Sequence, residues 1–374
     1  MMYTCHHPGE TMSSQPLRYS IIVAACVITC AVADAGAQPG QYHTWWRDAS
    51  APPPADTTRA TSLPLIRVQG RHIVNAHGDT IVFRGVAISD PDKIEHEGHW
   101  NRDHFIHVHD LGATIVRIPV HPVAWRERTP ERYLVLLDQA VQWCTELGMY
   151  VIIDWHTIGN LKMELFQDPM YNTTQRETFE FWRTIARHFR GHHTPALYEL
   201  FNEPTLYRGE LGRMSWSEWK KLNEDMIALI RAYDPEKIPL VAGLDWAYDL
   251  TPLAIEPIEA EGIAYVTHPY PHKRTKPYEP KWEENFGFAA GKYPVIATEL
   301  GFTLGTEGLA DNEDYGKAIT TYLERKGIGW VCWVFDPEWT PSMLKSWDTY
   351  TLTESGEFFR KALHRTPARP GASK

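Results

Sequence analysis

Two glutamates at the ends of two separate apolar runs are the residues of this chain best suited to carry out chemistry. Leu197–Phe201 is one such run, and it leads directly into Asn202 and Glu203. The second, Pro294–Thr298, leads directly into Glu299. Apolar runs of this length are typical of buried strands, so each carboxylate should leave the core at the end of a strand. Two carboxyl groups that face one cleft are what the hydrolysis of a glycosidic bond requires.

The elements that must position these glutamates alternate between strand and helix from about Leu63 onward. Strands are predicted at Ile81–Val86, Thr114–Val120, Tyr150–Asp154, Ala196–Phe201, Leu240–Ala242, Ile263–Thr267, Pro294–Thr298 and Gly329–Val334. Helices are predicted at Arg102–Leu111, Pro130–Leu147, Thr174–Phe189, Ser215–Tyr233, Trp282–Ala290, Glu313–Lys326 and Glu354–His364. The pattern predicts an α/β fold, a (β/α)8 TIM barrel forming one catalytic domain, whose chemistry lies at the carboxyl ends of the strands.

Three local features qualify this pattern. Ile73-Val74 and the turn at His77-Gly78 suggest a small hairpin before the first barrel strand. The fifth crossover, after Leu250, is short and gives little helical signal. Pro204 should end the strand that carries Glu203, because proline has no N–H to donate to a strand ladder.

Composition limits the classes of partner. The chain has 374 residues, 43% hydrophobic and 22% charged, with a formal net charge of −10. A net charge this negative argues against nucleic acid or an anionic membrane surface as a binding partner. The 15 Trp and 17 Tyr either pack in the core or form flat platforms on which sugar rings stack. We expect a monomer that needs no cofactor.

The N-terminal 37 residues have the layout of a secretory signal peptide. Arg18 precedes an apolar stretch, residues 21–32, which is followed by small residues at 33–37. That stretch is too short for a transmembrane helix, which needs about 20 residues. Translation could start at Met12, and the sequence around Cys26 resembles a lipoprotein box. We therefore expect a secreted protein, extracellular or periplasmic.

The domain boundaries follow from this composition. Residues 1–37 are expected to be the signal peptide and residues 38–63, rich in Pro, Ala and Thr, a linker or arm. The catalytic domain is expected at 64–366 and a short tail at 367–374. After removal of the signal, only Cys144 and Cys332 remain, and we expect both to be buried free thiols, with no disulfide framework or zinc site.

The residues at the predicted strand ends form a set that closely resembles family 5 of the glycoside hydrolases, the cellulase-like group of the Asn-Glu-Pro barrel clan. The resemblance covers about Ile81 to Leu363. It rests on eight positions in the expected order: Arg117, His156, Asn202, Glu203, His268, Tyr270, Glu299 and Trp333.

The resemblance implies a role for each of these side chains. It makes Glu203 the general acid/base and Glu299 the nucleophile, 299 − 203 = 96 residues apart. Arg117 would favour the charged form of Glu299, and Tyr270 would orient it by a hydrogen bond. Asn202 would bond the sugar 2-hydroxyl.

The remaining candidate site residues are histidines and tryptophans. His156 and His268 would be hydrogen-bonding partners of the substrate and the carboxylates, and Trp333 would form the floor beneath the sugar at the scissile bond. Trp246 resembles a stacking position of family cellulases. Two weaker candidates are Trp100, for a sugar subsite at the barrel top, and Trp339, for an extension of the cleft.

Histidines crowd residues 96–109, and two of them, His104 and His107, are three apart on a predicted helix. They could share a metal ion, but no carboxylate stands at a matching spacing. We therefore expect packed or surface histidines and no metal site.

Taken together, the sequence predicts a secreted, retaining endo-β-1,4-glucanase acting on a β-linked polysaccharide. A β-mannanase, or a hydrolase of mixed-linkage glucan, glucomannan or xyloglucan, would use the same chemistry, because loops set the specificity. A non-catalytic sugar-binding barrel is the alternative from another class.

Overall fold

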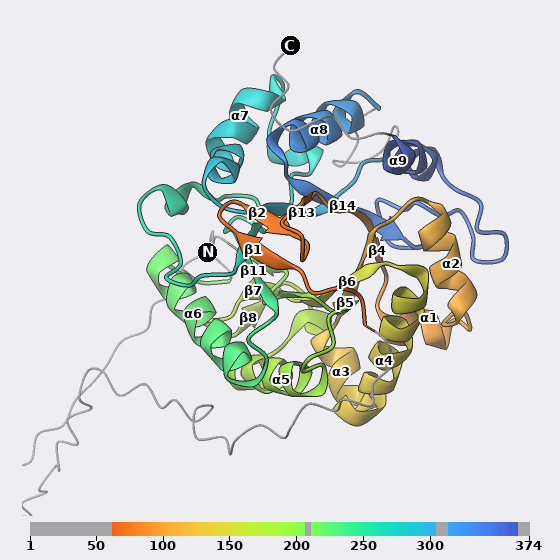
Figure 1. Cartoon of the computed structure of the whole chain (residues 1–374), viewed down its shortest axis with the longest axis horizontal. Coiled ribbons are helices and arrows are strands. Elements are labelled where there is room, and N and C mark those ends of the chain that lie inside the picture. The colour runs from red at the N-terminus through yellow and green to blue at the C-terminus, as the bar shows by residue number, and fades with distance from the viewer. Residues whose placement is uncertain (1–61, 206–210, 304–312, 366–374) are drawn as a thin grey trace, which may run out of the picture. The chain divides into compact units, whose positions relative to one another are not determined.

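The chain folds into a closed barrel of eight parallel strands surrounded by helices, as the sequence predicts (Figure 1). The structure is a computed structural model that describes residues 62–205, 211–303 and 313–365. The strands follow one another around the barrel in chain order. They are β4 (Arg84–Ile88), β5 (Ile115–Val120), β6 (Tyr150–Trp155), β9 (Leu197–Glu199), β11 (Ile238–Ala242), β12 (Ala264–Val266), β13 (Val295–Leu300) and β14 (Gly329–Phe335).

The helices pack around the outside of this barrel (Figure 1). They are α1 (Pro91–His96), α2 (Arg102–Asp110), α3 (Pro122–Arg128), α4 (Pro130–Leu147), α5 (Gln175–His188), α6 (Trp216–Tyr233), α7 (Tyr278–Asn285), α8 (Glu313–Lys326) and α9 (Glu354–His364). Local signals set several of their ends. Ser215 and Glu218 form a capping box at the start of α6. Gly148, with φ 76°, ends α4 in the left-handed conformation that glycine adopts without steric cost.

Side chains on the two faces of the strands form two separate cores. One fills the barrel and includes Ile115, Ile152, Leu197 and Ile296. The other lies between the strands and the helices and includes the neighbours of these residues, such as Val116. Both faces of a parallel barrel strand are therefore buried, which is why these strands appear in the sequence as continuous apolar runs.

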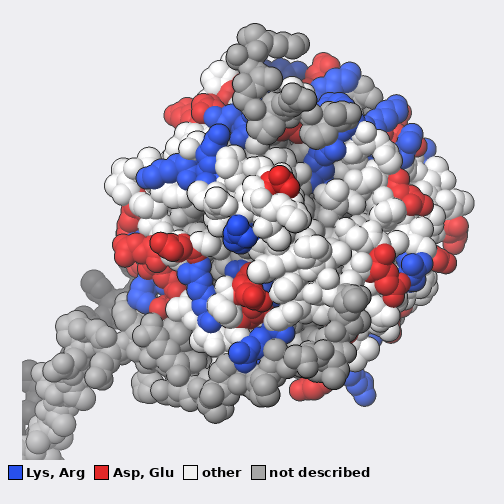
Figure 2. Space-filling view, viewed as in Figure 1, with Lys and Arg blue, Asp and Glu red and all other residues white. Residues whose placement is uncertain are grey.

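The hairpin predicted near Ile73 is present but takes one residue from the predicted first strand. The strands β1 (Arg67–Gln69), β2 (His72–Val74) and β3 (Thr80–Ile81) form a small antiparallel sheet in which Ile81 pairs with Ile73. The barrel strand begins only at Arg84. Ile73 belongs to the barrel-interior core, so the hairpin covers one end of the barrel and lies in front in Figure 1. Figure 2 shows this face, on which basic and acidic side chains are interspersed.

The strand that carries Glu203 differs from the prediction, because the barrel strand β9 ends at Glu199 and Pro204 is the last residue of a separate short strand. Glu203–Pro204 is a short strand, β10, in a second small sheet with β7 (Ile158–Asn160) and β8 (Leu165–Phe166). The hydrogen bonds of β10 to β7 come from the N–H groups of Glu203 and Thr205. Pro204 lies between these donors, so its missing N–H costs no ladder bond.

Two connections also differ from the prediction. The fifth crossover contains only a short 3-10 helix, η3 (Thr251–Ala254), in agreement with its weak signal. The helix predicted at 282–290 is instead α7, shifted toward the N-terminus, followed by the 3-10 helix η5 (Gly287–Gly291). The helices α1 and α3 were not predicted; each begins with a proline, which is well suited to the first helical position.

Cys144 and Cys332 are buried free thiols, as expected, and burial raises the pKa of each. The signal peptide predicted at 1–37, most of the arm at 38–63 and the tail at 367–374 lie outside the described residues. In the part of the chain that is described, none of the helices has the length and hydropathy needed to cross a membrane.

Candidate active site

A cleft of about 1510 Å³ opens at the carboxyl ends of the barrel strands. Its volume exceeds the roughly 300–1,000 Å³ of ordinary small-molecule pockets, so it has room for several sugar rings. Of the ten predicted site residues, the lining includes His156, Asn202, Glu203, Trp246, Tyr270, Glu299 and Trp333.

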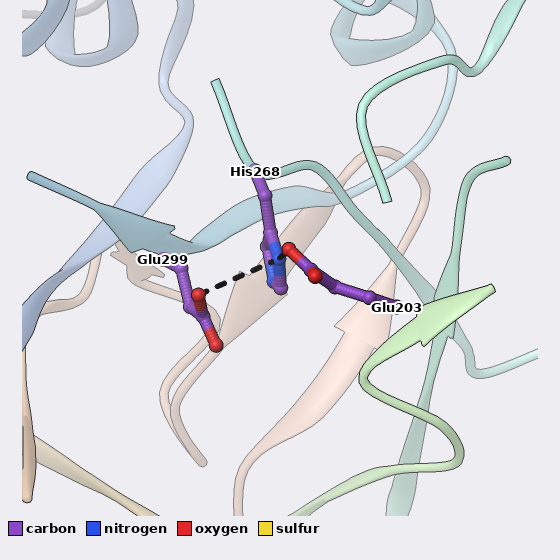
Figure 3. A group of neighbouring side chains, drawn as sticks. All are labelled: Glu203, His268 and Glu299. Carbon is purple, nitrogen blue, oxygen red and sulfur yellow. Dashed lines mark hydrogen bonds and ion pairs between the residues drawn. The ribbon is translucent and has the colours of Figure 1, made fainter. Parts of the chain in front are cut away.

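Glu203 and Glu299 face each other in this cleft (Figure 3). A carboxylate oxygen of each, together with a ring nitrogen of His268, all lie within 4.8 Å of one another. The side chains of Glu203 and Glu299 approach from opposite sides in Figure 3, with the His268 ring between them. The position of each glutamate after a barrel strand, which the sequence predicts, therefore brings both carboxyl groups to one site.

The two glutamates differ in their hydrogen bonds. Both oxygens of Glu299 accept one: Oε1 from Arg117 at 2.8 Å and Oε2 from the Tyr270 hydroxyl at 2.8 Å. Glu203 is held by one partner among the described residues, Nδ1 of His268 at 3.0 Å. Burial and the charge of Glu203 raise the pKa of Glu299, against the opposing effect of His268, Arg117 and Tyr270. Donors on both oxygens suit a carboxylate that works in its charged form.

Arg117 joins the carboxylates of several strands at the bottom of the cleft. It is fully buried and donates two hydrogen bonds to Glu199, at 2.7 and 3.1 Å, besides its bond to Glu299. It also pairs with Asp154 at 2.9 Å. Burial opposes the charge of Arg117, but these three carboxylates outweigh it and raise the pKa of Arg117 well above its usual range. The guanidinium is therefore a permanent positive charge beneath Glu299.

His268 lies between the two glutamates and touches both. Its Nδ1 is 3.0 Å from Glu203 and 3.7 Å from Glu299. Burial alone would lower the pKa of His268, but Glu299, Glu199 and Glu203 together raise it to about 9. These three carboxylates therefore favour the positively charged form of the imidazole.

His156 and Asn202 turn their remaining polar atoms toward the cleft. Nδ1 of His156 bonds Asp154 at 2.6 Å, and burial holds the pKa of His156 well below its usual range. When Nδ1 of the neutral ring donates to Asp154, Nε2 is left as an acceptor. Oδ1 of Asn202 accepts from Arg117 at 2.7 Å, which leaves its NH₂ group as a donor for a ligand.

Trp333 and Trp339 form an aromatic surface in the cleft. Their rings lie nearly parallel, with centroids 6.0 Å apart and an interplanar angle of 13°. Trp333 also stacks on His156 at 5.2 Å, and its Nε1 donates to the Thr340 carbonyl. The structure thus brings Trp339, a weaker candidate in the sequence, into the cleft lining.

Trp246 reaches the cleft on a strained loop. Asp245, Trp246 and Ala247 have φ of 59°, 54° and 57°, a conformation that costs about 1 kcal/mol or more for each non-glycine residue. Lys273 offsets this cost by donating to the Asp245 carbonyl at 2.8 Å and by lying 4.9 Å from the Trp246 ring centroid. Nε1 of Trp246 donates to Gln167 at 3.0 Å, and its backbone N–H donates to the Pro204 carbonyl, which holds the residue beside β10.

Trp100 is not brought to the cleft. It packs against Phe105 and Trp143, and its Nε1 donates to Gln139 at 2.9 Å. The loop between α1 and α2 places this ring against α2 and α4, so the indole packs against these helices and has its hydrogen bond there.

The histidines at 96–109 are partly packed and partly at the surface, because His96, His107 and His109 are exposed. His104 is fully buried, which lowers its pKa to about 3, and His107 stacks on Tyr350 at 4.0 Å.

Sequence reasoning missed Glu199 and Thr298 as site residues. Glu199 lies inside a run that we read as apolar. A carboxylate in a buried strand needs a charged or hydrogen-bonding partner, so its presence in this run was the signal that could have identified it as a site residue. Thr298 adjoins Glu299, so regular alternation would put the two on opposite faces of β13. The pairing of β13 with β14 shifts register between Ala297 and Leu300, and this irregularity lets both side chains contact the site.

A (β/α)8 barrel with such a cleft at its strand carboxyl ends defines a barrel enzyme. The chain belongs to the cellulase family, glycosyl hydrolase family 5, whose sequence model matches residues 74–338. This confirms the resemblance read from the strand-end residues. It also confirms that the protein is a glycoside hydrolase.

Individual relatives of this chain are endoglucanases by name. An endoglucanase of Thermobifida fusca is 26% identical over 360 residues, which cover 90% of this chain and 72% of that protein. An endoglucanase of Clostridium saccharobutylicum is 27% identical over 236 residues, 61% of this chain and 49% of that protein. The chain therefore spans between about half and three quarters of the length of these two relatives.

Solved structures give the same fold. A beta-glucanase of Saccharophagus degradans, crystallised in complex with cellotetraose, has a TM-score of 0.81 and 43% identity. That match covers 85% of this chain and 98% of the other. The catalytic domain of the Thermobifida fusca endoglucanase has a TM-score of 0.66 at 23% identity, covering 80% and 97% of the two chains, and is similar in fold alone.

Proposed function

We propose that this protein is a secreted endo-β-1,4-glucanase that hydrolyses its substrate with retention of configuration. The observation that carries the proposal is the pair of carboxylates, with oxygens within 4.8 Å of each other in one large cleft. Retaining glycosidases hold their carboxyl groups about 5–5.5 Å apart, whereas inverting enzymes leave about 6.5–9.5 Å for a water molecule. The shorter spacing supports direct attack by one carboxylate.

In the first step, Glu299 attacks the anomeric carbon and forms a glycosyl ester, while Glu203 gives its proton to the leaving oxygen. In the second step, Glu203 accepts a proton from water, and the resulting hydroxide breaks the ester and restores Glu299. The hydrogen bonds support this division of roles. Glu299 is surrounded by donors that favour its charged form, and Glu203 has one partner that can either donate or accept a proton.

A β-1,4-linked glucan is the substrate class that we propose. The complex of the Saccharophagus degradans beta-glucanase with cellotetraose supports it, as do the endoglucanases among the relatives. The aromatic rings of Trp246, Trp333 and Trp339 in a cleft of about 1510 Å³ suit a chain of flat sugar rings.

A β-mannanase or a xyloglucan hydrolase would share the two carboxylates. A hydrolysis panel on soluble cellulose, barley glucan, mannan, xyloglucan and laminarin tests the substrate. We expect the highest rate on a β-1,4-glucan, and a clear preference for mannan would contradict the assignment. A non-catalytic binding barrel would release no reducing ends from any of them.

Trp333→Ala should lower turnover about ten- to a hundredfold, because the ring positions the sugar for attack. Trp333 contacts His156 and Trp339 in the cleft, so its loss removes the centre of the aromatic surface. Steady-state kinetics on soluble cellulose and a thermal melt of each variant measure the effect. Trp333→Phe is the matched control and should recover much of the activity. If Trp333→Ala stays within about a factor of two of the parent, the ring serves packing alone.

We also propose that residues 1–37 are removed on export, which leaves the arm at 38–63, the catalytic domain at 64–366 and the tail at 367–374. The mature protein should begin near Gly36 or Gln38 and be found outside the cytoplasm. N-terminal sequencing of the exported protein checks this. An intact segment from Arg18 to Val32 on soluble or secreted protein would contradict it.

A further inference from the structure

A buried threonine and a buried glutamate lie behind His268, on the side away from Glu203. Nε2 of His268 is 3.0 Å from Oγ1 of Thr298, and the same Oγ1 is 2.9 Å from Oε1 of Glu199. All three side chains have zero solvent exposure. The mechanism given above uses neither Thr298 nor Glu199.

The charge of Glu199 decides the direction of these hydrogen bonds. Burial alone would raise the pKa of Glu199, but Arg117 and His268 outweigh it and lower that pKa. An ionised carboxylate only accepts hydrogen bonds, so the single hydroxyl proton of Thr298 must point to Glu199. The Thr298 oxygen can then only accept from His268. Nε2 of His268 therefore carries a proton.

The opposite ring nitrogen, Nδ1, faces Oε1 of Glu203 at 3.0 Å. When Glu203 is ionised, a protonated Nδ1 donates a hydrogen bond to it. When Glu203 is protonated, a bare Nδ1 accepts one. Both states fit the same heavy-atom positions, so Glu203 can change its charge between the two steps without a rearrangement of its partner.

The surroundings of His268 are strongly charged. Glu199, Glu203 and Glu299 raise its pKa, and burial opposes them. Three further titratable or charged groups surround His268. Two of them, Asp154 and His156, interact with it electrostatically. The third, Arg117, bonds both Glu199 and Glu299.

We propose that Thr298 and Glu199 are positioning residues that keep a proton on Nε2 of His268 and so reserve Nδ1 for sharing a proton with Glu203. The inference rests on the proposed role of Glu203 as the acid/base. His268 and Glu203 then hold one proton between them. The pair gives this proton to the leaving oxygen in the first step and regains one from water in the second, so the proton count balances.

The alkaline limb of the pH profile of kcat/KM tests the proposal, because it reports the loss of the shared proton from the free enzyme. Thr298→Val keeps the shape of the side chain but removes the acceptor of the Nε2 proton. Nε2 and Glu199 are 3.6 Å apart, too far for a direct hydrogen bond to replace it. The charged form of the His268 ring is then less stable. The alkaline limb of the kcat/KM profile should therefore move to lower pH by about one unit, which corresponds to a kcat/KM about tenfold lower at high pH.

Matched variants distinguish the shift of the alkaline limb from a general loss of activity. Thr298→Ser restores the hydroxyl and should restore the parent profile. Glu199→Gln removes a charge and should move the limb in the same direction. On a dinitrophenyl cellobioside, whose leaving group needs no acid, kcat/KM of Thr298→Val should remain close to that of the parent. An alkaline limb that does not move in Thr298→Val would overturn the proposal, and so would an equal loss on both substrates.

Nitrogen-15 NMR of the histidine rings tests the tautomer without reference to activity. The His268 signals are assigned by their loss in His268→Gln. In the parent protein, above the pH at which His268 loses its charge, the remaining proton should stay on Nε2. A neutral ring protonated on Nδ1 would refute the inference. If the parent hydrolyses no glycan, the proposed function fails instead, and the NMR result still decides the tautomer.

Discussion

Glu299→Gly is expected to lose between about 10⁴- and 10⁶-fold of the hydrolytic activity, the loss typical of removing a nucleophile. It should still transfer sugar from an activated α-glycosyl fluoride to an acceptor. Removal of the side chain leaves a hole beside the anomeric carbon, between Arg117 and Tyr270, which now bond Glu299 at 2.8 Å each. The α-fluoride imitates the glycosyl ester and fits this hole, while Glu203 remains to activate the acceptor.

The measurement is product analysis with α-cellobiosyl fluoride and an aryl cellobioside acceptor, alongside reducing-end release from soluble cellulose. Glu279→Gly is a suitable control, because Glu279 lies on α7 and pairs with Arg325 at the surface, outside the cleft. It should hydrolyse cellulose like the parent. Hydrolysis by Glu299→Gly at a rate near that of the parent would exclude Glu299 as the nucleophile.

Glu203→Ala is expected to behave differently, since it removes the acid/base and leaves the nucleophile. General acid–base catalysis contributes about 10²- to 10⁴-fold, and natural substrates should lose that much. A dinitrophenyl cellobioside needs no acid, so the glycosyl ester on Glu299 should still form and then accumulate. Mass spectrometry of the intact protein should detect this ester.

Added azide should speed the breakdown of the ester, because it attacks without a general base and fits the space left by the Glu203 side chain. The product should be the β-glycosyl azide, with configuration retained. Proton NMR of the parent reaction provides the independent check. If the α-anomer forms first from a β-glucan, the enzyme inverts configuration and both assigned roles are wrong.

The sequence alone was sufficient for the barrel and for the two glutamates that face each other in its cleft. Strand and helix periodicity is a local property, and Glu203 and Glu299 each follow an apolar run directly. In a barrel of parallel strands, all carboxyl ends meet at one mouth, so residues far apart in the chain can be placed there together. Arg117, Asn202 and Tyr270 were instead identified as site residues through the resemblance to the family.

Other features depended on how the strands pair and on which way the loops turn. Trp100 and Trp246 both follow barrel strands, yet only Trp246 reaches the cleft, on three residues with positive φ that Lys273 holds in place. Pro204 is accepted in a strand because its neighbours on either side supply the hydrogen bonds.

The contacts beneath the carboxylates were decided by the tertiary structure alone. Thr298 bonds Glu199 from 99 residues away, and it does so where the register of β13 shifts against β14. Strict alternation along a strand allows only one of two adjacent residues to face the barrel interior. Whether Thr298 can contact the site together with Glu299 therefore depends on a pairing irregularity between two strands, which no local pattern in the sequence records.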